Sequence, residues 1–375
     1  MRVRSAVLRE MGAPEPYSDT RPLEVVELDL DPPGPGELLV RVGAAGLCHS
    51  DLSVIDGSRP RVMPMALGHE AAGEVVETGP GVAGFAAGDH VVLAFVPACG
   101  ECEPCRAGRA ALCEPGAAAN AAGTLLGGDR RLHDPGGEEI NHHLGVSAFS
   151  DHIVVSQASA VKVDPELPFE IAALFGCAVL TGVGAAVNAA RIEPGQRVAV
   201  FGLGGVGLSA LLGAVLQEAA TIVAVDVVAA KLDLARELGA TDAVAAGPGA
   251  VAAIREITGG GADHVIETVG SAKVLSDAYD ATRRGGTTTT VGLPDPGQML
   301  SIPAVSLVAE ERTLRGSYLG SSVPARDLPR FIDLYRQGRL DVERLLTDRL
   351  ALEDINEGFD RLASGAAVRQ AVVFG

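Results

Sequence analysis

The chain has 375 residues, 47% of them hydrophobic and 21% charged, with a formal net charge of -18 at pH 7. This length exceeds what one hydrophobic core usually supports and predicts two domains. The acidic charge disfavours a nucleic-acid or anionic-lipid partner, and no uninterrupted apolar stretch reaches the roughly 18 residues of a membrane span. We therefore expect a globular protein that acts on a small molecule.

The first eight residues read as a short strand and lack the apolar stretch and cleavage site of an export signal. A cytoplasmic location is the resulting expectation. In that reducing compartment the six cysteines are better explained as metal ligands than as disulfides.

The rhythm of the predicted elements changes twice along the chain. Residues 1–178 show short strands between Gly and Pro turns, which predicts a mostly β domain. Residues 179–321 alternate strand and helix, which predicts a parallel, doubly wound α/β sheet, and residues 322–375 are expected to return to the first domain. In chain order we expect strands at 37–42, 88–93 and 197–201, a helix at 206–218, a strand at 221–226, a helix at 231–238, strands at 264–267 and 287–291, helices at 328–336 and 355–363, and a strand at 370–374.

A glycine turn stands between a predicted strand and an apolar helix, with the G-x-G-x-x-G sequence Gly202-Leu203-Gly204-Gly205-Val206-Gly207. These glycines allow a tight turn and the close approach of a pyrophosphate to the positive end of the helix dipole. Asp226 ends the next strand, 19 residues after Gly207. A carboxylate there would bind the adenosine ribose and repel a 2'-phosphate, which favours NAD over NADP.

Four cysteines are closely spaced as C-x2-C-x2-C-x7-C: Cys99, Cys102, Cys105 and Cys113. An iron-sulfur cluster would usually have its next cysteine after three residues and before a proline, whereas here seven residues intervene. A nucleic-acid zinc ribbon is disfavoured by the acidic flanks Glu101, Glu103 and Glu114. The quartet predicts a closed, structural zinc site.

The other two cysteines, Cys48 and Cys177, lie far apart and need a further ligand to hold a metal ion. His69, in the turn Gly68-His69-Glu70, could join them and leave a fourth position open for water or substrate. Taken singly, each of the three would also pass as an ordinary buried cysteine or histidine.

With these motifs in this order, the whole chain resembles a zinc-dependent alcohol dehydrogenase of the medium-chain dehydrogenase/reductase family. The resemblance rests on Cys48, Gly68-His69-Glu70, the cysteine quartet, Phe175-Gly176-Cys177, the glycine turn and Asp226. It implies a GroES-like, mostly β catalytic domain, a Rossmann domain that binds NAD, and two Zn²⁺ ions per chain.

The resemblance also implies roles for single residues. Cys48, His69 and Cys177 would hold the catalytic zinc, with Asp51 hydrogen-bonded to His69 and Glu70 behind the site. Ser50 matches the hydroxyl that takes the substrate proton. His49, Lys231 and Arg369 match positions that bind the cofactor, beside the glycines, Val206 and Asp226.

Five positions match the substrate pocket of relatives: Phe95, His143, Leu144, Leu293 and Tyr318. His143 stands where relatives often carry an aromatic residue, and Arg59 is placed near the mouth. Ser53 replaces a histidine that carries the proton to solvent in many relatives, so water or the cofactor ribose is expected to take over.

The expected reaction is hydride transfer between a primary or aromatic alcohol, or its aldehyde, and NAD. A second possibility is a formaldehyde dehydrogenase that acts on a thiol adduct. Its glutathione form is disfavoured because Arg59 and Ala117 match positions where relatives carry an acid and an arginine. A remote alternative is a non-catalytic zinc-binding relative.

The segment between Cys113 and His142 resembles the insertion found in the dimeric branch of this family. This resemblance implies a homodimer.

Overall fold

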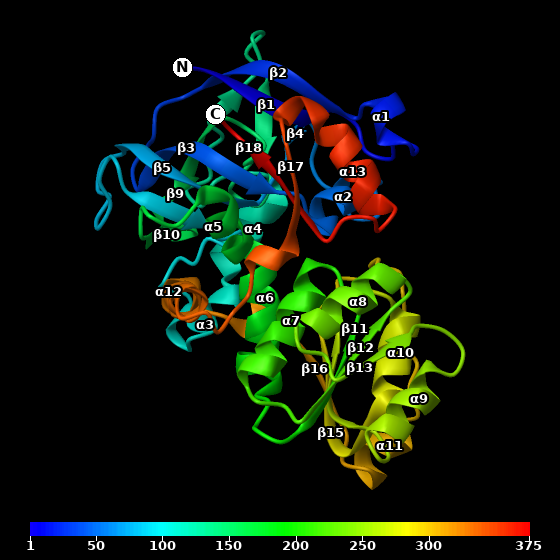
Figure 1. Cartoon of the computed structure of the whole chain (residues 1–375). Coiled ribbons are helices and arrows are strands. Elements are labelled where there is room, and N and C mark those ends of the chain that lie inside the picture. The colour runs from blue at the N-terminus through cyan, green and yellow to red at the C-terminus, as the bar shows by residue number, and fades with distance from the viewer. The chain divides into compact units, whose positions relative to one another are not determined.

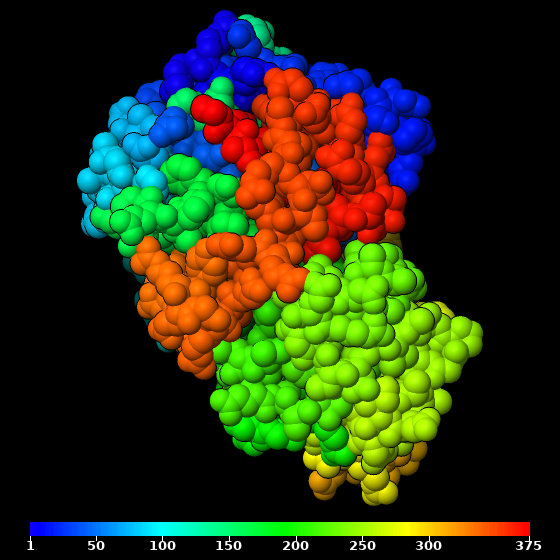
Figure 2. All heavy atoms as spheres, viewed as in Figure 1, coloured from blue at the N-terminus to red at the C-terminus, as the bar shows by residue number.

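The computed structural model describes residues 1–375, and the chain divides into two compact units (Figure 1). The first unit comprises Met1–Cys177, Val323–Pro329 and Leu346–Gly375, and the second comprises Ala178–Ser322 and Arg330–Leu345. Of the C-terminal segment 322–375, Val323–Pro329 and Leu346–Gly375 belong to the first unit, whereas Ser322 and Arg330–Leu345 belong to the second. Figure 2 shows this return as orange and red residues beside the blue and green surface of the first unit.

The first unit contains a closed barrel and a larger sheet. Around the barrel the strands are β1 (Arg2–Leu8), β2 (Leu23–Leu30), β7 (Leu132–His133), β8 (Glu139–His142) and β4 (Met65–Ala66). The sheet is ordered β10 (Ala160–Val163), β6 (His90–Leu93), β5 (Glu70–Thr78), β3 (Glu37–Gly46), β18 (Arg369–Val373) and β17 (Leu346–Leu350), with β9 (His152–Ser156) paired to β3. Apolar residues at alternate positions of β3, including Leu38, Val40 and Val42, enter the main core of this unit.

Short helices complete the first unit: α1 (Tyr17–Thr20), α2 (His49–Ile55), α3 (Glu103–Arg106), α4 (Glu114–Ala122), α5 (Phe169–Leu174) and α13 (Ile355–Ala363). Helix α13 buries Ile355, Phe359 and Leu362 in the same core as β3, a spacing that places all three on one helical face.

The second unit is built on a six-stranded parallel sheet. Its order is β13 (Asp242–Ala245), β12 (Thr221–Asp226), β11 (Arg197–Phe201), β14 (Ala262–Glu267), β15 (Thr282–Thr290) and β16 (Thr313–Gly316). The central strands are almost continuously apolar because helices cover both faces of a parallel sheet. This is the doubly wound sheet predicted for residues 179–321.

The helices of this unit are α6 (Leu180–Gly184), α7 (Gly205–Leu216), α8 (Ala229–Glu237), α9 (Ala250–Ile257), α10 (Ala272–Ala281) and α11 (Ala304–Ala309), and α12 (Pro324–Arg336) begins in the first unit and ends in the second. The predicted helices at 206–218, 231–238, 328–336 and 355–363 correspond to α7, α8, α12 and α13. Helices α9 and α10 and strands β13 and β16 were not among the expected elements.

One helix, Phe169–Ala190, is long and apolar enough to cross a membrane by length and composition, with a hydropathy of 1.9. However, 89% of its 18-residue apolar stretch is buried inside the protein, as in the core helix of a globular protein. The helix contains two stretches of π-helix, Phe175–Val179 and Ala185–Ala190.

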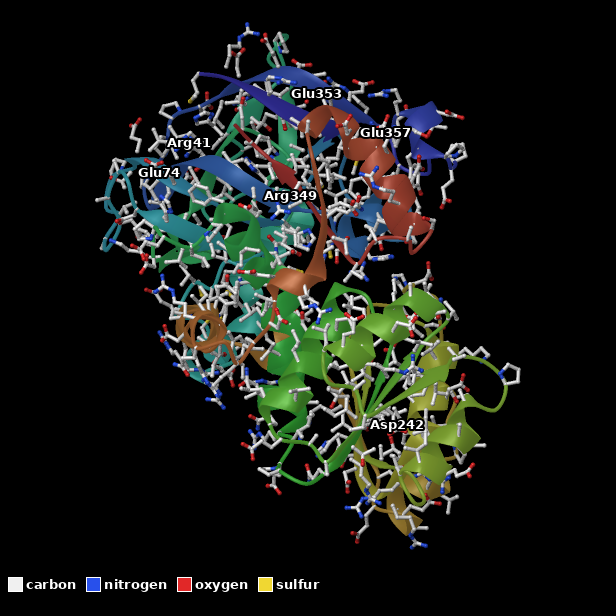
Figure 3. The ribbon with its side chains drawn as sticks, viewed as in Figure 1. Arg41, Glu74, Asp242, Arg349, Glu353 and Glu357 are labelled. Atoms are coloured by element: carbon white, nitrogen blue, oxygen red, sulfur yellow. The ribbon has the colours of Figure 1, made fainter.

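The charged surface of the first unit carries ion pairs between neighbouring strands and helices (Figure 3). Arg41 of β3 lies 2.5 Å from Glu74 of β5, directly across the antiparallel ladder. Arg349 pairs with Glu170 at 3.4 Å, and Glu357 pairs with Arg21 at 3.5 Å. All of these side chains are partly or largely exposed, so each pair stabilises the fold by at most about 1 kcal/mol.

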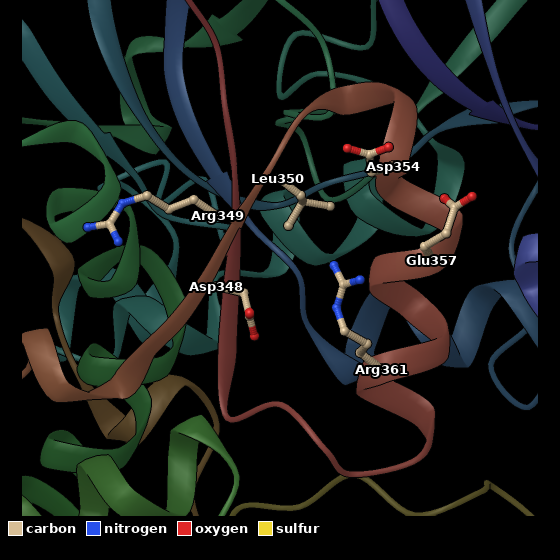
Figure 4. Close-up of a pocket in the computed structure, with 6 residues that line it drawn as sticks. All are labelled: Asp348, Arg349, Leu350, Asp354, Glu357 and Arg361. Atoms are coloured by element: carbon tan, nitrogen blue, oxygen red, sulfur yellow. The ribbon is translucent and has the colours of Figure 1, made fainter.

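A surface hollow of about 380 Å³ in the first unit is lined mainly by charged residues of β17, α13 and the short turn between them (Figure 4). Its lining consists of Asp348, Arg349, Leu350, Asp354, Glu357 and Arg361. None of these is a predicted site residue, and the hollow lacks the apolar lining that small-molecule sites usually have.

Candidate active site

Cys48, His69 and Cys177 come together in the first unit. Their sulfur and imidazole ligand atoms all lie within 4.8 Å of one another, and the three residues are 6%, 1% and 5% exposed. Two thiols and one imidazole form a ligand set that suits tetrahedral Zn²⁺ and leaves its fourth position for another ligand. The predicted catalytic zinc ligands are thus adjacent and buried.

The strand pairing of β3 and β5 brings Cys48 and His69 together. Gly46 pairs with Glu70 in the antiparallel register, so the residues just after β3 and just before β5 leave the sheet at the same end. Gly68 adopts a φ of 94°, in the left-handed region that favours glycine. This turn directs the next residue, His69, toward Cys48.

Cys177 lies in the π-helical stretch Phe175–Val179. Single π turns within α-helices occur frequently at functional sites because they redirect side chains. The preceding Gly176 packs against β6 so closely that a Cβ atom there would lie 2.4 Å from the carbonyl oxygen of Leu93. Only glycine therefore permits the helix to approach the sheet at this point.

The orientation of His69 fits a metal ligand. Its Nδ1 lies 3.2 Å from Asp51 Oδ1, while its Nε2 is buried and has no hydrogen-bond partner. An imidazole that donates one N–H to a carboxylate presents the lone pair of its other nitrogen, as metal-binding histidines usually do. The unpartnered Nε2 is the observation that best fits a bound cation.

The pKa values of the two thiols, Cys48 and Cys177, are shifted in opposite directions. A hydrogen bond from Cys177, followed by the charges of Arg369 and His69, holds the pKa of the Cys48 thiol well below its usual range despite burial. The same hydrogen bond, together with burial, raises the pKa of Cys177. A cation bound to both sulfurs would favour the thiolate form of each.

Glu70 and Arg369 form a buried pair behind these ligands. Arg369 Nη1 lies 3.4 Å from Glu70 Oε2 and donates a hydrogen bond to the Leu47 carbonyl oxygen at 2.9 Å. Burial raises the pKa of Glu70 to about 7, against the opposing charge of Arg369. Glu70 thus lies where the resemblance implied, and Arg369, expected at the cofactor, contacts Glu70.

The cysteine quartet forms a second cluster in the first unit. The sulfurs of Cys99, Cys102, Cys105 and Cys113 lie within 4.8 Å of one another, and none of them is in a disulfide. Backbone N–H groups donate to two of these sulfurs: Cys102 to Cys99 at 3.4 Å, and Cys99 and Gly116 to Cys113 at 3.3 and 3.4 Å. Four sulfurs arranged in this way suit a closed tetrahedral zinc site.

The glycine turn has the geometry of a phosphate-binding loop in the second unit. Gly202 has a φ of 87°, and a Cβ on Gly207 would lie 1.8 Å from the Gly202 carbonyl oxygen. A Cβ on Gly204, by contrast, would meet nothing within 4 Å. The open space at Gly204, beside the start of α7 at Gly205 and Val206, suits close approach by a pyrophosphate.

Asp226 lies at the end of β12 and is 9% exposed. It accepts hydrogen bonds from Leu203 N at 2.6 Å and Val228 N at 2.9 Å, and so joins the glycine turn to its own strand. Lys231, half-buried, lies in α8 shortly after it. These residues sit at the carboxyl ends of parallel strands, where dinucleotides bind in this type of sheet.

The remaining predicted site residues are divided between the first unit and the second unit. His49 is exposed and Ser50 is half-buried in the first turn of α2, Phe95 and Leu144 are buried in the first unit, and Leu293 and Tyr318 belong to the second unit. Phe95 packs on His69 in a T-shaped arrangement, with ring centroids 5.4 Å apart and an angle of 88° between ring planes.

One contact was not anticipated from the sequence. His143 Nδ1 lies 3.1 Å from Asp51 Oδ1, so that Asp51 faces two histidines. No spacing rule connects residues 51 and 143. The one sequence feature that pointed to this position is that His143 stands where relatives often carry an aromatic residue.

Comparison with known proteins agrees with this geometry. Residues 34–165 match the alcohol dehydrogenase GroES-like domain, and residues 205–337 match the zinc-binding dehydrogenase family. The chain belongs to the zinc-dependent alcohol dehydrogenases. This confirms the predicted fold, a GroES-like domain with a Rossmann-like coenzyme-binding domain, and makes the protein a zinc-dependent oxidoreductase.

Individual relatives span the whole chain. A protein of Amycolatopsis methanolica named NDMA-dependent alcohol dehydrogenase is 39% identical over 100% of this chain and 99% of its own. The Synechocystis protein named S-(hydroxymethyl)glutathione dehydrogenase is 36% identical over 99% of this chain and 100% of its own. The structure of benzyl alcohol dehydrogenase from Acinetobacter calcoaceticus is 32% identical, with a TM-score of 0.92 and 100% of both chains covered.

Proposed function

We propose that this protein transfers hydride between a primary or aromatic alcohol, or the matching aldehyde, and NAD. The observation that carries the proposal is the buried set of Cys48, His69 and Cys177, with His69 Nε2 lacking a hydrogen-bond partner. The similarity to an enzyme named benzyl alcohol dehydrogenase supports an aromatic alcohol as substrate.

The proposed roles follow from the chemistry of each group. Cys48, His69 and Cys177 would hold zinc, which would supply Lewis-acid chemistry that favours loss of the alcohol proton and polarises the aldehyde carbonyl. Asp51 fixes the imidazole of His69 through Nδ1. Ser50, two residues after Cys48, accepts the substrate proton and passes it on.

NAD supplies the hydride acceptor, bound by the glycine turn and Asp226. Gly204 and the start of α7 would receive its pyrophosphate, and Lys231 would bind near the adenosine ribose. From the resemblance, His49 and Arg369 are proposed as further cofactor-binding residues. The Asp226 carboxylate favours the free ribose hydroxyls of NAD, since a 2'-phosphate would meet its negative charge.

The cysteine quartet holds a second, structural zinc, which gives two Zn²⁺ per chain. The protein works in the cytoplasm as a homodimer. Exposed apolar side chains on and before α11 support the dimer: Met299, Val305 and Val308 are 86%, 71% and 82% exposed. Such a cluster beside an edge strand is typical of a protein interface.

Two measurements test the proposal. NADH formation across alkyl, allylic and aryl alcohols should be highest for primary or aromatic alcohols, and NADP should support a much lower kcat/KM. Metal analysis of the purified protein should give two zincs per chain. One zinc per chain together with no turnover of any alcohol would indicate the remote alternative, a non-catalytic relative.

A second candidate is oxidation of a thiol adduct of formaldehyde. It is favoured by the 36% identity to a protein named S-(hydroxymethyl)glutathione dehydrogenase. The same assay with formaldehyde plus glutathione or another low-molecular-weight thiol separates the two. Activity only with the adduct would replace the leading proposal.

A further inference from the structure

One oxygen of the Asp51 carboxylate contacts two histidines and a backbone N–H group. The carboxylate is fully buried, and its Oδ1 accepts hydrogen bonds from Gly68 N at 3.1 Å and from His69 Nδ1 at 3.2 Å. His143 Nδ1 lies 3.1 Å from the same oxygen. This nitrogen is buried and makes no hydrogen bond, so its close electrostatic contact with the Asp51 carboxylate is the interaction that offsets its burial.

The backbone around His143 is fixed by a tight buried turn. His143 N donates to Ser147 Oγ at 3.0 Å, and its carbonyl oxygen accepts from Val146 N at 3.0 Å. Leu144 and Ser147 both have positive φ values, 53° and 57°, which a well-packed surrounding must enforce. His143 therefore reaches Asp51 from a rigid support.

The same turn is bonded to the segment that carries His69. Ala148 N donates to the Gly68 carbonyl oxygen at 3.0 Å, and Phe149 N donates to the Leu67 carbonyl oxygen at 3.0 Å. The position of His143 relative to His69 is thus set by the backbone, and does not depend on a flexible side chain.

The His143 ring also packs on His69. The two ring centroids are 5.4 Å apart with an angle of 89°, and Phe95 makes the same kind of contact at 5.4 Å and 88°. His69 therefore contacts two rings edge-on, and only one of these rings also bears a nitrogen facing Asp51.

We propose that His143 is a positioning residue for the zinc ligand His69, acting through Asp51. Through its contact with the same Oδ1 of Asp51, it helps to fix the carboxylate that sets the rotation and tautomer of the His69 imidazole. Carboxylates behind a metal-binding histidine typically change metal affinity by 10- to 100-fold. The inference rests on the proposed zinc site at Cys48, His69 and Cys177.

Two substitutions distinguish the contribution of the His143 nitrogen from that of its ring packing. His143→Phe keeps the ring that packs on His69 and removes the nitrogen near Asp51. His143→Asn loses the ring but keeps an N–H donor close to the position of Nδ1. The matched control is His152→Phe, since His152 Nδ1 lies 3.1 Å from Asp151 Oδ1 in a partly exposed pair on β9.

The readouts are the rate of zinc loss to a chelator and the visible spectrum of the Co²⁺-substituted protein. We expect His143→Phe to lose one zinc 10- to 100-fold faster and to shift the Co²⁺ bands, while the zinc of the cysteine quartet stays bound. His143→Asn should remain within about threefold of wild type, as should His152→Phe. Retention of the quartet zinc and an unchanged circular dichroism spectrum report that each variant is folded.

The outcomes are distinguishable. If wild type holds zinc at both sites and His143→Phe releases it at the wild-type rate, the positioning role is wrong and the proposed function stands. If His143→Asn is as impaired as His143→Phe, ring packing and not the nitrogen is responsible. A third zinc per chain that His143→Phe abolishes would make Asp51, His69 and His143 metal ligands themselves. Wild type without zinc at Cys48, His69 and Cys177 would contradict the proposed function.

Discussion

At the scale of single residues, Ser53 departs most clearly from the pattern of relatives. It is half-buried in α2, and its hydroxyl donates to the His49 carbonyl oxygen at 2.7 Å, one helical turn back. A hydroxyl engaged in this way, with no pKa near 7, cannot act as a base for the substrate proton. The wild-type enzyme should therefore work best at alkaline pH.

Introducing a base at this position tests the explanation. Ser53→His places an imidazole with an ordinary pKa of about 6.5 on the same helix, so the acid limb of the kcat against pH profile should move down by about one unit. Steady-state kcat measured from pH 6 to 10 gives the profile, with the exposed Ser364→His as the control. An unchanged profile in Ser53→His would show that proton release takes another path.

His142 illustrates a buried histidine that serves the fold. Its Nε2 accepts a hydrogen bond from Arg131 N at 3.1 Å, which places the proton on Nδ1, 3.4 Å from Ser147 Oγ. Burial, with the nearby charges of Arg130, Arg131 and His133, lowers the pKa of His142 to about 3. The native protein thus holds this histidine neutral throughout the weakly acidic range.

The sign of the effect on stability follows from linkage. Between pH 6.5 and about 3 the unfolded chain binds a proton at this residue and the native chain does not, so the free energy of unfolding falls as pH falls. His142→Gln keeps an acceptor for Arg131 N without a titrating group, and should lose less stability than wild type between pH 7 and 5. Thermal unfolding at each pH provides the comparison, and parallel curves for both proteins would contradict it.

At the scale of elements, two glycines of one turn have opposite roles. Gly207→Ala forces a Cβ to within 1.8 Å of the Gly202 carbonyl oxygen, so α7 must move away from β11, at a cost of about 1–3 kcal/mol. Gly204→Ala meets no atom within 4 Å and should leave the free energy of unfolding nearly unchanged.

Gly204→Ala should mainly weaken cofactor binding, whereas Gly207→Ala should also lower the stability of the fold. Gly204→Ala fills the space proposed for the pyrophosphate, so the Kd for NADH should rise tenfold or more while Tm stays near wild type. Gly207→Ala should lower Tm by a few degrees as well as weakening cofactor binding. Fluorescence titration with NADH and thermal unfolding measure both, and wild-type NADH affinity in Gly204→Ala would place the cofactor elsewhere.

The elements that sequence could predict are those whose signal is local. The glycine turn, the strand before it and the cysteine quartet are each contained in a short stretch, and the structure has a strand at Arg197–Phe201, a positive φ at Gly202 and four clustered sulfurs. The helix Phe169–Ala190 was missed because glycines weaken the helical pattern. Gly182 is required there because a Cβ would lie 2.2 Å from the Val206 carbonyl oxygen, a contact that sequence does not reveal.

The site shows the same limit. Ligand types predicted that Cys48, His69 and Cys177 lie together, as they do. The contact of Asp51 with His143 depends on a buried turn after β8 that no local pattern describes. Likewise, the contact of Arg369 with Glu70 was not predicted, because it joins two strands that are distant in the sequence. Long-range contacts of this kind arise from the packed fold.

At the scale of the whole molecule, the net charge of -18 opposes self-association, so a dimer needs a compensating apolar contact. The second unit offers one. Strand β16 is the last in its sheet and pairs only with β15, and Thr313, Arg315 and Gly316 on it are exposed. The preceding helix α11 exposes Val305 and Val308, so an open strand edge and apolar side chains occur in one short segment.

This arrangement predicts how the oligomer responds to mutation and to salt. Light scattering should give twice the chain mass of 38.2 kDa for wild type and the monomer mass for Val308→Asp, because a buried unpaired carboxylate would disrupt the interface. Val76→Asp, at an exposed valine of β5, should remain dimeric. Because the repulsion between two acidic chains extends about 30 Å at 0.01 M salt and about 10 Å at 0.1 M, dilution at low salt should favour dissociation of wild type. A wild-type monomer at all salt concentrations, or a dimeric Val308→Asp, would show that this segment does not form the interface.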